Sequence, residues 1–284
     1  MIISVASGKG GTGKTTVSVN LALSLGNAQI LDCDVEEPNV GIFINPEIER
    51  TIEVKVPVPE VNLNVCNFCG KCSQVCNYNA ICVIPPRENT KGNVLIFDHL
   101  CHSCGACWYF CPQKAIMEKE KIIAYVEVGK RGDLKYVGGK LVPSQVLSPV
   151  VIDEVKRQMD EDRVVIIDAS PGTACPVVRA ISGSDFCILV TEPTPFGLND
   201  LNLAYQLTRL LKVPSGIVLN RADYGDKTLI KEFAEKNDIP LLLEIPFDNK
   251  IAQTYSEGIP VVEAIPEYRE IFKELYEKIS EIIR

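Results

Sequence analysis

The residues with the most specific spacing in this chain are its cysteines. Eight of the twelve fall in two groups that share the spacing C-x2-C-x2-C-x3-C. The members are Cys66, Cys69, Cys72 and Cys76 in the first group and Cys101, Cys104, Cys107 and Cys111 in the second. In a reducing compartment, cysteines grouped in this way indicate thiolate ligands of a metal centre rather than disulfides. The others, Cys33, Cys82, Cys175 and Cys187, lie outside these groups.

The spacing of the two groups resembles that of bacterial two-cluster ferredoxins. In those proteins three close thiolates hold one [4Fe-4S] cluster and the fourth ligates the other cluster. The resemblance implies one cluster on Cys66, Cys69, Cys72 and Cys111, and a second on Cys76, Cys101, Cys104 and Cys107. Zinc also binds C-x2-C pairs, but a repeated group of four cysteines fits a cubane better. This chain departs from the pattern at one place, because Asn77 rather than proline follows Cys76.

The two groups belong to a longer internal repeat. The segment 66-CNFCGKCSQVCNYNAICVI-84 aligns with 101-CHSCGACWYFCPQKAIMEK-119 at one constant offset. Four cysteines, a glycine and an Ala-Ile pair coincide in the alignment. We therefore expect two copies of one small unit, related by a pseudo-twofold axis.

A second motif predicts a phosphate site near the N-terminus. Residues 8-GKGGTGKT-15 match G-x-x-x-x-G-K-[ST] between an apolar strand and a helix. Glycines let the backbone amides face a polyphosphate, Lys14 is expected on the β- and γ-phosphates, and the Thr15 hydroxyl is expected on Mg²⁺. The residues predicted to contact ATP or ADP here are Gly8, Lys9, Gly10, Gly11, Thr12, Gly13, Lys14, Thr15 and Thr16.

The extra lysine inside this loop, Lys9, resembles the signature lysine of the MinD/ParA type of P-loop ATPase. That group also includes the nitrogenase iron protein. The resemblance implies an ATP-dependent homodimer in which Lys9 reaches the partner's ATP. The stretch 32-DCDVEEPN-39 resembles switch I, which implies that Asp34 positions or activates the attacking water and that Asp32 and Asp34 belong to the magnesium site.

Two further stretches extend the same resemblance. In 164-VVIIDASPG-172, which resembles switch II, Asp168 is expected to hold a magnesium-bound water, and Gly172 is expected near the γ-phosphate. The stretches 217-IVLNR-221 and 245-IPFD-248 resemble the adenine-binding segments, which implies contacts from Asn220, Arg221, Pro246 and Asp248. Asp or Asn after a strand is also a common turn former or helix cap, and this alternative stays open for these polar residues. The predicted catalytic set is Lys9, Lys14, Asp34 and Asp168.

The elements needed to position these residues alternate along the chain. Apolar strands are expected at 2–6, 29–32, 163–168, 185–190, 215–220 and 241–245, and helices at 15–25, 198–211, 227–237 and 265–283. Such alternation predicts an α/β fold, with a mostly parallel sheet covered by helices on both faces. The alternation stops near the proline-containing stretch 57–65 and is expected to resume after about residue 120. The predicted domains are an ATPase domain over 1–56 and 121–284 and an inserted small α+β ferredoxin-like domain over 57–120.

The composition and charge of the chain limit the kinds of partner that we expect. The formal net charge of −8 argues against nucleic-acid binding, which normally needs a basic face. No stretch approaches the roughly 18 apolar residues of a membrane span. The phosphate motif begins too early for a cleaved signal peptide, so we expect a cytoplasmic protein. The expected partners are a second copy of the chain and either a redox protein or an iron–sulfur acceptor protein.

Three functions remain open on the sequence. The first is an ATPase that couples nucleotide-dependent dimer and switch changes to low-potential electron transfer through two [4Fe-4S] clusters. The second is an iron–sulfur assembly or carrier ATPase, although such relatives typically use a C-x2-C pair outside the ferredoxin region, which this chain lacks. The third is a MinD/ParA-like spatial-positioning ATPase with structural clusters. Cys175, seven residues after Asp168, is left open between a cluster ligand and a structural residue.

Overall fold

The computed structural model describes residues 1–284, which divide into two compact units. The first unit comprises Met1–Ile52, Val126–Lys140 and Pro149–Arg284. The second comprises Glu53–Tyr125 and Leu141–Ser148. The cysteine groups lie in the second unit and the phosphate motif lies in the first.

The first unit is built on a parallel sheet. Its parallel strands, in spatial order, are β11 (Leu241–Ile245), β10 (Ser215–Asn220), β9 (Phe186–Thr191), β1 (Ile2–Ala6), β8 (Val164–Ala169), β2 (Ala28–Cys33) and β7 (Leu134–Leu141). The six strands expected from the sequence all form, each within one residue of its expected bounds. Most of their residues are buried, as expected for strands covered on both faces. The prediction of an α/β fold with a mostly parallel sheet is confirmed.

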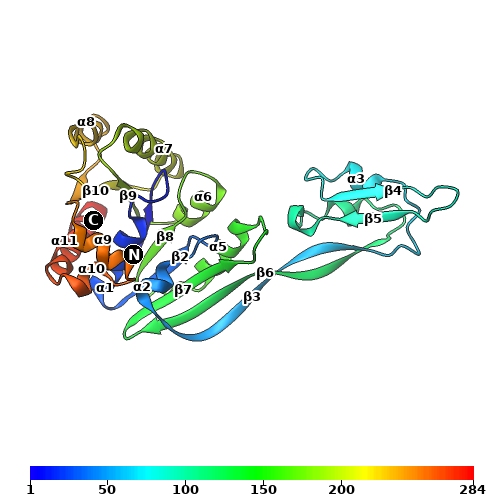
Figure 1. The fold of residues 1–284 in the computed structure, drawn as a ribbon, viewed down its shortest axis with the longest axis horizontal. Coiled ribbons are helices and arrows are strands. Elements are labelled where there is room, and N and C mark those ends of the chain that lie inside the picture. Colours follow the sequence, from blue (N-terminus) through cyan, green and yellow to red (C-terminus); the bar gives the residue numbers. More distant parts are fainter. The chain divides into compact units, whose positions relative to one another are not determined.

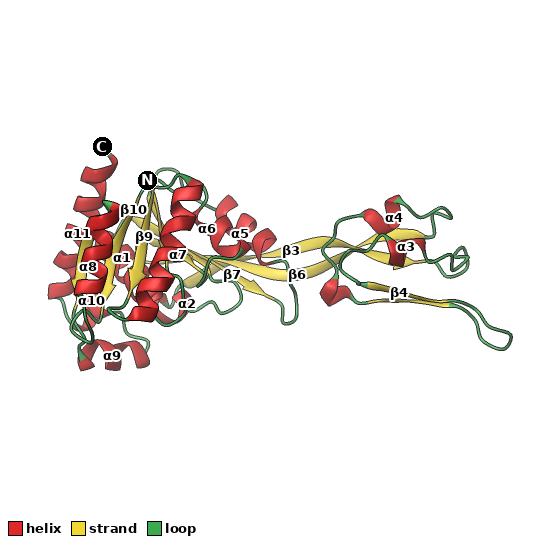
Figure 2. Ribbon diagram, turned by 90° about the horizontal axis from the view of Figure 1, so that it is seen from above, coloured by secondary structure: helices red, strands yellow, loops and turns green.

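Helices cover both faces of this sheet (Figures 1 and 2). The longer ones are α1 (Lys14–Leu25), α5 (Ser148–Arg157), α7 (Pro195–Leu211), α8 (Thr228–Asn237), α9 (Asn249–Ser256) and α11 (Glu267–Ile283). The shorter ones in this unit are α2 (Val40–Ile44), α6 (Cys175–Ile181) and α10 (Val261–Ala264). Helices α1 and α11 pack together over one face, whereas α6 and α7 pack on strands β8, β1 and β9.

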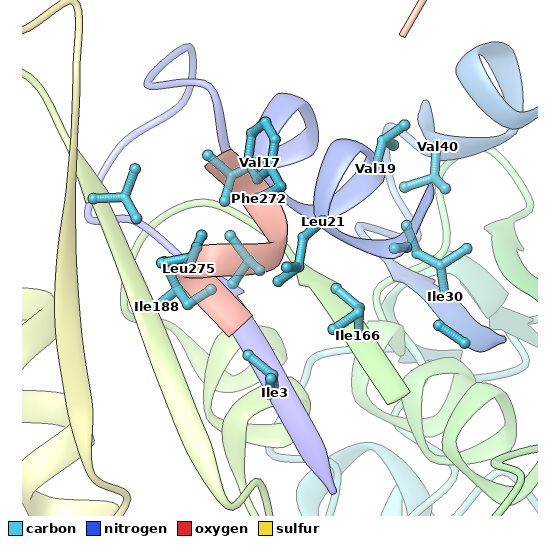
Figure 3. Close-up of a cluster of buried hydrophobic side chains, with 14 of the residues drawn as sticks. Ile3, Val17, Val19, Leu21, Ile30, Val40, Ile166, Ile188, Phe272 and Leu275 are labelled. Carbon is cyan, nitrogen blue, oxygen red and sulfur yellow. The ribbon is translucent and has the colours of Figure 1, made fainter. Parts of the chain in front are cut away.

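A cluster of buried hydrophobic side chains fills the space between α1, α11 and the sheet (Figure 3). Leu21 of α1 and Leu275 of α11 lie beside Ile3 and Ile166 of the strands, and all four are at most 1% exposed. The apolar stripe of α11 is therefore used for packing in the first unit. This core fixes α1, and so it fixes the phosphate loop that precedes α1.

The strands beyond β2 at one end of the sheet were not among those expected from the sequence. Strand β3 (Glu47–Val61) runs without interruption through Pro57 and Pro59, where a boundary was expected. It is the last strand in the sheet order, and prolines are tolerated there because an edge strand leaves some N–H groups unpaired. The chain then returns as β6 (Ile116–Arg131), and a two-residue connection with Gly132 at φ 57° joins β6 to β7 as an antiparallel hairpin. Residues 116–141 thus form a hairpin, and the helix–strand alternation resumes only with α5.

The second unit carries the internal repeat in its backbone conformation. Its elements are α3 (Lys71–Gln74), the antiparallel pair β4 (Ile81–Ile84) and β5 (Asn93–Ile96), a 3-10 helix (Asp98–Leu100) and α4 (Ala106–Tyr109). Left-handed residues recur in pairs separated by 35 residues: Phe68 with Ser103, Gly70 with Gly105, and Asn79 with Lys114. Helices α3 and α4 follow Gly70 and Gly105 in the same way. The two halves of the repeat therefore fold alike.

Candidate functional sites

The phosphate loop leaves β1 and enters α1 through closely packed glycines. Gly13 has φ 96°, and a Cβ there would lie 2.3 Å from the Asn220 amide nitrogen. A Cβ at Gly8 would lie 2.2 Å from the backbone carbonyl oxygen of Asp200 in α7. Only glycine fits at these two positions, because the close neighbours at both and the left-handed conformation at Gly13 leave no room for a side chain.

Gly8→Ala is expected to destabilise the first unit. Its methyl group meets backbone rather than a flexible side chain, so the free energy of unfolding should fall by about 1–3 kcal/mol. Gly10→Ala is the matched control, because nothing lies within 4 Å of its Cβ position. Chemical denaturation of both variants measures the difference, and equal losses would contradict the packing argument.

Lys14, the first residue of α1, and Asp168, near the end of β8, influence each other's charge. Lys14 is only 7% exposed, and burial lowers the pKa of its ammonium while Asp168 and Asp34 oppose this shift. Burial also raises the pKa of Asp168 to about 6, against the hydrogen bond from Thr15 and the charge of Lys14. The Thr15 hydroxyl lies 2.7 Å from Asp168 Oδ2, whereas Asp168 Oδ1 is buried with no partner. An unpartnered carboxylate oxygen beside a threonine hydroxyl fits a hydrated Mg²⁺, whose charge would favour the ionised form of Asp168.

The two aspartates of the switch I stretch occupy different environments. Asp32 is fully buried, and its carboxylate accepts hydrogen bonds from the backbone N–H groups of Asp34 at 3.1 Å and Val40 at 3.0 Å. Burial raises its pKa well above the usual range, with a further contribution from Asp168. Asp34 is partly exposed and lines a cavity. Asp32 thus holds the loop from Asp34 to Val40 in place, and Asp34 is the aspartate available to a ligand.

That cavity, about 1270 Å³ including its opening to solvent, joins the predicted phosphate and adenine segments. Its lining contains these expected residues: Gly10, Gly11, Gly13, Lys14, Thr15, Thr16, Asp34, Asn220, Arg221, Pro246 and Asp248. Other expected residues do not line it: Gly8, Lys9, Thr12, Asp32, Asp168 and Gly172. The structure therefore brings the phosphate loop, switch I and both base-side stretches to one cavity of nucleotide size.

Sequence reasoning missed several residues of this cavity. They are Glu37, Asn39, Pro171, Phe247, Ile251, Ala252 and Tyr255. Asn39 carried a signal, since it ends the switch I stretch and its Oδ1 lies 3.0 Å from the Thr15 hydroxyl. Tyr255 carried none, because α9 contributes it from a distant part of the sequence.

Asn220 is engaged with the phosphate loop. Its Nδ2 donates to the Thr12 carbonyl at 2.8 Å, and its Oδ1 accepts from the Arg221 N–H at 3.0 Å. The side chain thus fastens the end of β10 to the loop that precedes α1. The expected contact with adenine would use the same side-chain amide that already bonds to the Thr12 carbonyl.

Lys9 is held by a carboxylate of its own chain. Its Nζ lies 3.3 Å from Glu192, in the loop after β9, and Glu192 also pairs with Arg221 at 2.5 Å. Glu192 is 12% exposed, whereas Lys9 is 35% exposed. An ion pair at such an accessible position is weak, about 0–1 kcal/mol, so Lys9 is free to leave it for a stronger anion.

In the second unit, two cavities of similar size are each lined by four cysteines. The first, about 340 Å³ including open solvent, has Cys66, Cys69, Cys72 and Cys111 in its lining. The second, about 330 Å³, has Cys76, Cys101, Cys104 and Cys107. The fold therefore groups the cysteines crosswise, with the last cysteine of each group at the other group's cavity.

The thiols around both cavities accept equivalent hydrogen bonds. The backbone N–H groups of Phe68 and Ser103 each lie 3.4 Å from the sulfur of the cysteine two residues earlier, Cys66 and Cys101. The N–H groups of Ala80 and Ala115 likewise lie 3.3 Å from Cys76 and Cys111. Such donors stabilise negative sulfur, as a thiolate ligand requires.

No three His, Cys, Asp or Glu side chains lie close enough together to hold one metal ion. A cubane differs from a single ion in this respect, because each of its four thiolates binds a different iron atom. Burial raises the pKa of the Cys107 thiol to about 11, so iron binding there would release a proton. The four-sulfur cavities and their N–H donors fit two cubanes.

The cysteines of the first unit form no comparable group. Cys33 and Cys187 are fully buried, and Cys175 alone is exposed, at the start of α6. Cys82 is exposed on β4 and lines neither cavity.

None of the helices combines the length and apolar character needed to cross a bilayer.

Comparison with known proteins gives consistent matches. The family model for the CobQ/CobB/MinD/ParA nucleotide binding domain matches residues 3–261. An uncharacterised protein of Methanocaldococcus jannaschii is 30% identical over 264 residues, which are 91% of this chain and 90% of that protein. A Pyrococcus horikoshii protein named iron-sulfur cluster carrier protein is 24% identical over 308 residues, covering 99% of this chain and 87% of that protein.

Solved structures show the same fold. The cell division ATPase MinD of Pyrococcus furiosus superposes with a TM-score of 0.61 at 24% identity, covering 99% of this chain and 98% of that one. The septum site-determining protein MinD of Pyrococcus horikoshii, complexed with Mg-ADP, gives 0.59 at 22% identity, covering 99% and 96%. At these identities the likeness establishes the α/β architecture alone.

Proposed function

The chain belongs to the CobQ/CobB/MinD/ParA nucleotide-binding family, and on that premise we propose that it is an ATP-hydrolysing iron–sulfur protein. In this proposal, nucleotide-dependent dimer and switch changes are coupled to low-potential electron transfer through two [4Fe-4S] clusters. The single observation that carries it is the pair of cavities, each lined by four cysteines, in a chain that also has a complete phosphate loop.

At the nucleotide site, each residue has a defined task. The loop amides and Lys14 bind the β- and γ-phosphates, and the buried position of Lys14 strengthens this attraction. Mg²⁺, when bound, neutralises phosphate charge. Thr15 and Asp168 hold its coordination sphere, and Asp34, which lines the cavity, orients the attacking water. Lys9 leaves Glu192 and contacts the ATP of a second protomer.

The proposed coupling follows the chain from switch I. The loop after Asp34 leads into α2, and β3 then continues from Ile52 of the first unit into Glu53 of the second. A change in the loop that Asp32 holds therefore has a short covalent route to the cysteine-bearing unit. Clusters supply one-electron chemistry there, and the N–H donors of the repeat stabilise their thiolates.

A carrier function is the second candidate. It is favoured by relatives named iron-sulfur cluster carrier protein, which match 98–99% of this chain at 24–26% identity in the archaeal examples. Against it, Cys175 is the only exposed cysteine of the first unit. A labile cluster shared across a dimer would obtain only two thiolates from that residue.

A spatial-positioning role is the third candidate, supported by the MinD fold likeness. Membrane attachment through an amphipathic C-terminal helix would need a free apolar face. In α11 that face is buried, with Phe272, Leu275 and Ile279 at most 1% exposed. We therefore place this function last.

Loading the purified chain tests the proposal. Anaerobic reconstitution should give about eight iron and eight sulfide per chain, since two cubanes require them. The same preparation should hydrolyse ATP only with Mg²⁺, and EDTA should stop hydrolysis while the iron content stays constant. Two zinc ions in place of iron, or hydrolysis that ignores EDTA, would contradict the proposal.

A further inference from the structure

The two cysteine cavities come from one repeated sequence but are lined by different side chains. Corresponding positions are 35 residues apart, so that Cys66 matches Cys101. Across this repeat the cysteines, the glycines and the N–H donors to sulfur are retained. The remaining differences between the two linings are therefore what distinguishes two otherwise equivalent cavities.

The first cavity is lined by three polar side chains that the second lacks. Asn67, Lys71 and Gln113 line the first cavity. Their counterparts in the second are His102, Ala106 and Tyr78. The rings of Tyr78 and His102 stack at 3.8 Å with an interplanar angle of 12°, and Trp108 adds a third aromatic ring to that lining.

These differences act on the charge of a reduced cluster. Four thiolates around an oxidised 2+ core carry a net charge of about −2, and one added electron makes this about −3. Lys71 forms no ion pair with a carboxylate in the structure, and its cation favours the more negative state. The amides of Asn67 and Gln113 offer further N–H donors at the first cavity, whereas the second cavity has Ala106 at the position of Lys71.

On the premise that both cavities hold clusters, which is the proposed function, we propose that the two sites differ in reduction potential. The site of Cys66, Cys69, Cys72 and Cys111 takes the electron first. A one-electron donor supplies one electron, the core at this site changes from 2+ to 1+, and no bond or proton moves. An electron that enters at the second site passes to the first, because the first site has the higher reduction potential. Lys71 raises that potential and is therefore a potential-determining residue.

The test is an anaerobic redox titration of the reconstituted full-length protein with viologen mediators, followed by EPR. Wild type should show two reduction steps. Lys71→Ala should lower the equilibrium constant of the higher-potential step by about threefold to tenfold, where tenfold equals 59 mV for one electron. The lower step should stay in place.

A reciprocal variant and a matched control sharpen the result. Ala106→Lys places a lysine at the counterpart position and should raise the lower step toward the higher one. Lys119→Ala removes one positive charge from the same unit without touching either cavity lining, and should move neither step.

Iron and sulfide analysis of every variant separates the two claims. A wild type without two clusters overturns the proposed function and this inference together. Two loaded clusters with a single common potential overturn the inference alone. The inference also fails if Lys71→Ala moves the lower step, or if it moves neither step while all eight iron atoms remain.

Discussion

Lys9→Ala is expected to abolish ATP-dependent dimerisation and to lower the ATPase rate by about 100-fold, the size of effect seen when one donor to a developing charge is lost. In the structure Lys9 is not part of the lining of the nucleotide cavity of its own chain. Lys9, which is 35% exposed, instead pairs with Glu192, whose carboxylate lies 3.3 Å from its Nζ. ATP binding by the monomer should therefore survive, as should both proposed clusters, because their cysteines belong to the other unit.

Two variants frame this result. Lys14→Ala removes a lysine that does line the cavity, so it should lose ATP binding itself. Glu192→Gln keeps the shape of the partner but removes its charge, and should leave dimerisation intact or strengthen it. Light scattering with ATP and steady-state hydrolysis measure both effects. Unchanged turnover of Lys9→Ala would count against a role across the dimer.

The second large effect is expected from Cys111→Ala. This cysteine belongs by sequence to the second group but lies at the cavity of the first. Its loss should therefore remove the cluster of Cys66, Cys69 and Cys72, which leaves about four of eight iron atoms. The remaining EPR signal should be the one that also survives in Cys69→Ala.

The counterpart variant provides the control. Cys76→Ala lies at the second cavity and should leave the signal that survives in Cys104→Ala. If each group of four instead held its own cluster, Cys111→Ala would match Cys104→Ala. That outcome would contradict the crosswise arrangement, whatever the total iron content.

Local signals in the sequence were sufficient for much of the fold. The continuous apolar runs of β1, β8, β9 and β10 predicted buried parallel strands, and all of them formed. The glycine spacing before α1 predicted a tight loop, and the structure shows why Gly8 and Gly13 are needed there. The apolar runs and the glycine spacing are local patterns and could be read from the sequence, but the contacts of Gly8 with Asp200 and of Gly13 with Asn220 could not.

Features that depend on distant partners were not predictable in this way. Strand β7 was missed because Gly138 and Gly139 weaken its pattern, yet both are needed: a Cβ at Gly139 would lie 2.7 Å from Val35, and one at Gly138 would lie 2.0 Å from the Tyr136 hydroxyl. Strand β3 was not predicted, because its prolines were interpreted as a domain boundary. The contact of Lys9 with Glu192 joins residues far apart in the sequence, and no local signal marks it.

The candidate sites also combine features that the sequence predicted with features that only the structure shows. Cysteine spacing predicted which residues are ligand candidates, and the crosswise cavities agree with the sets that the ferredoxin resemblance implied. The differences between the cavities, such as Lys71 against Ala106, become meaningful only when the lining is known. Asp32 and Asp34 look alike in sequence, but burial separates the loop-holding residue from the accessible one.

The most direct test of coupling between nucleotide and clusters measures electron transfer and iron transfer in one preparation. The reconstituted protein is reduced anaerobically, and electron transfer to a one-electron dye and iron transfer to an apo-acceptor are followed with ATP, with ADP and without nucleotide. We predict that ATP changes the rate of electron transfer by about fivefold or more while the iron stays bound, and that Lys14→Ala loses this response. ATP-stimulated loss of iron to the acceptor, with electron transfer unchanged, would contradict the proposed coupling of ATP to electron transfer.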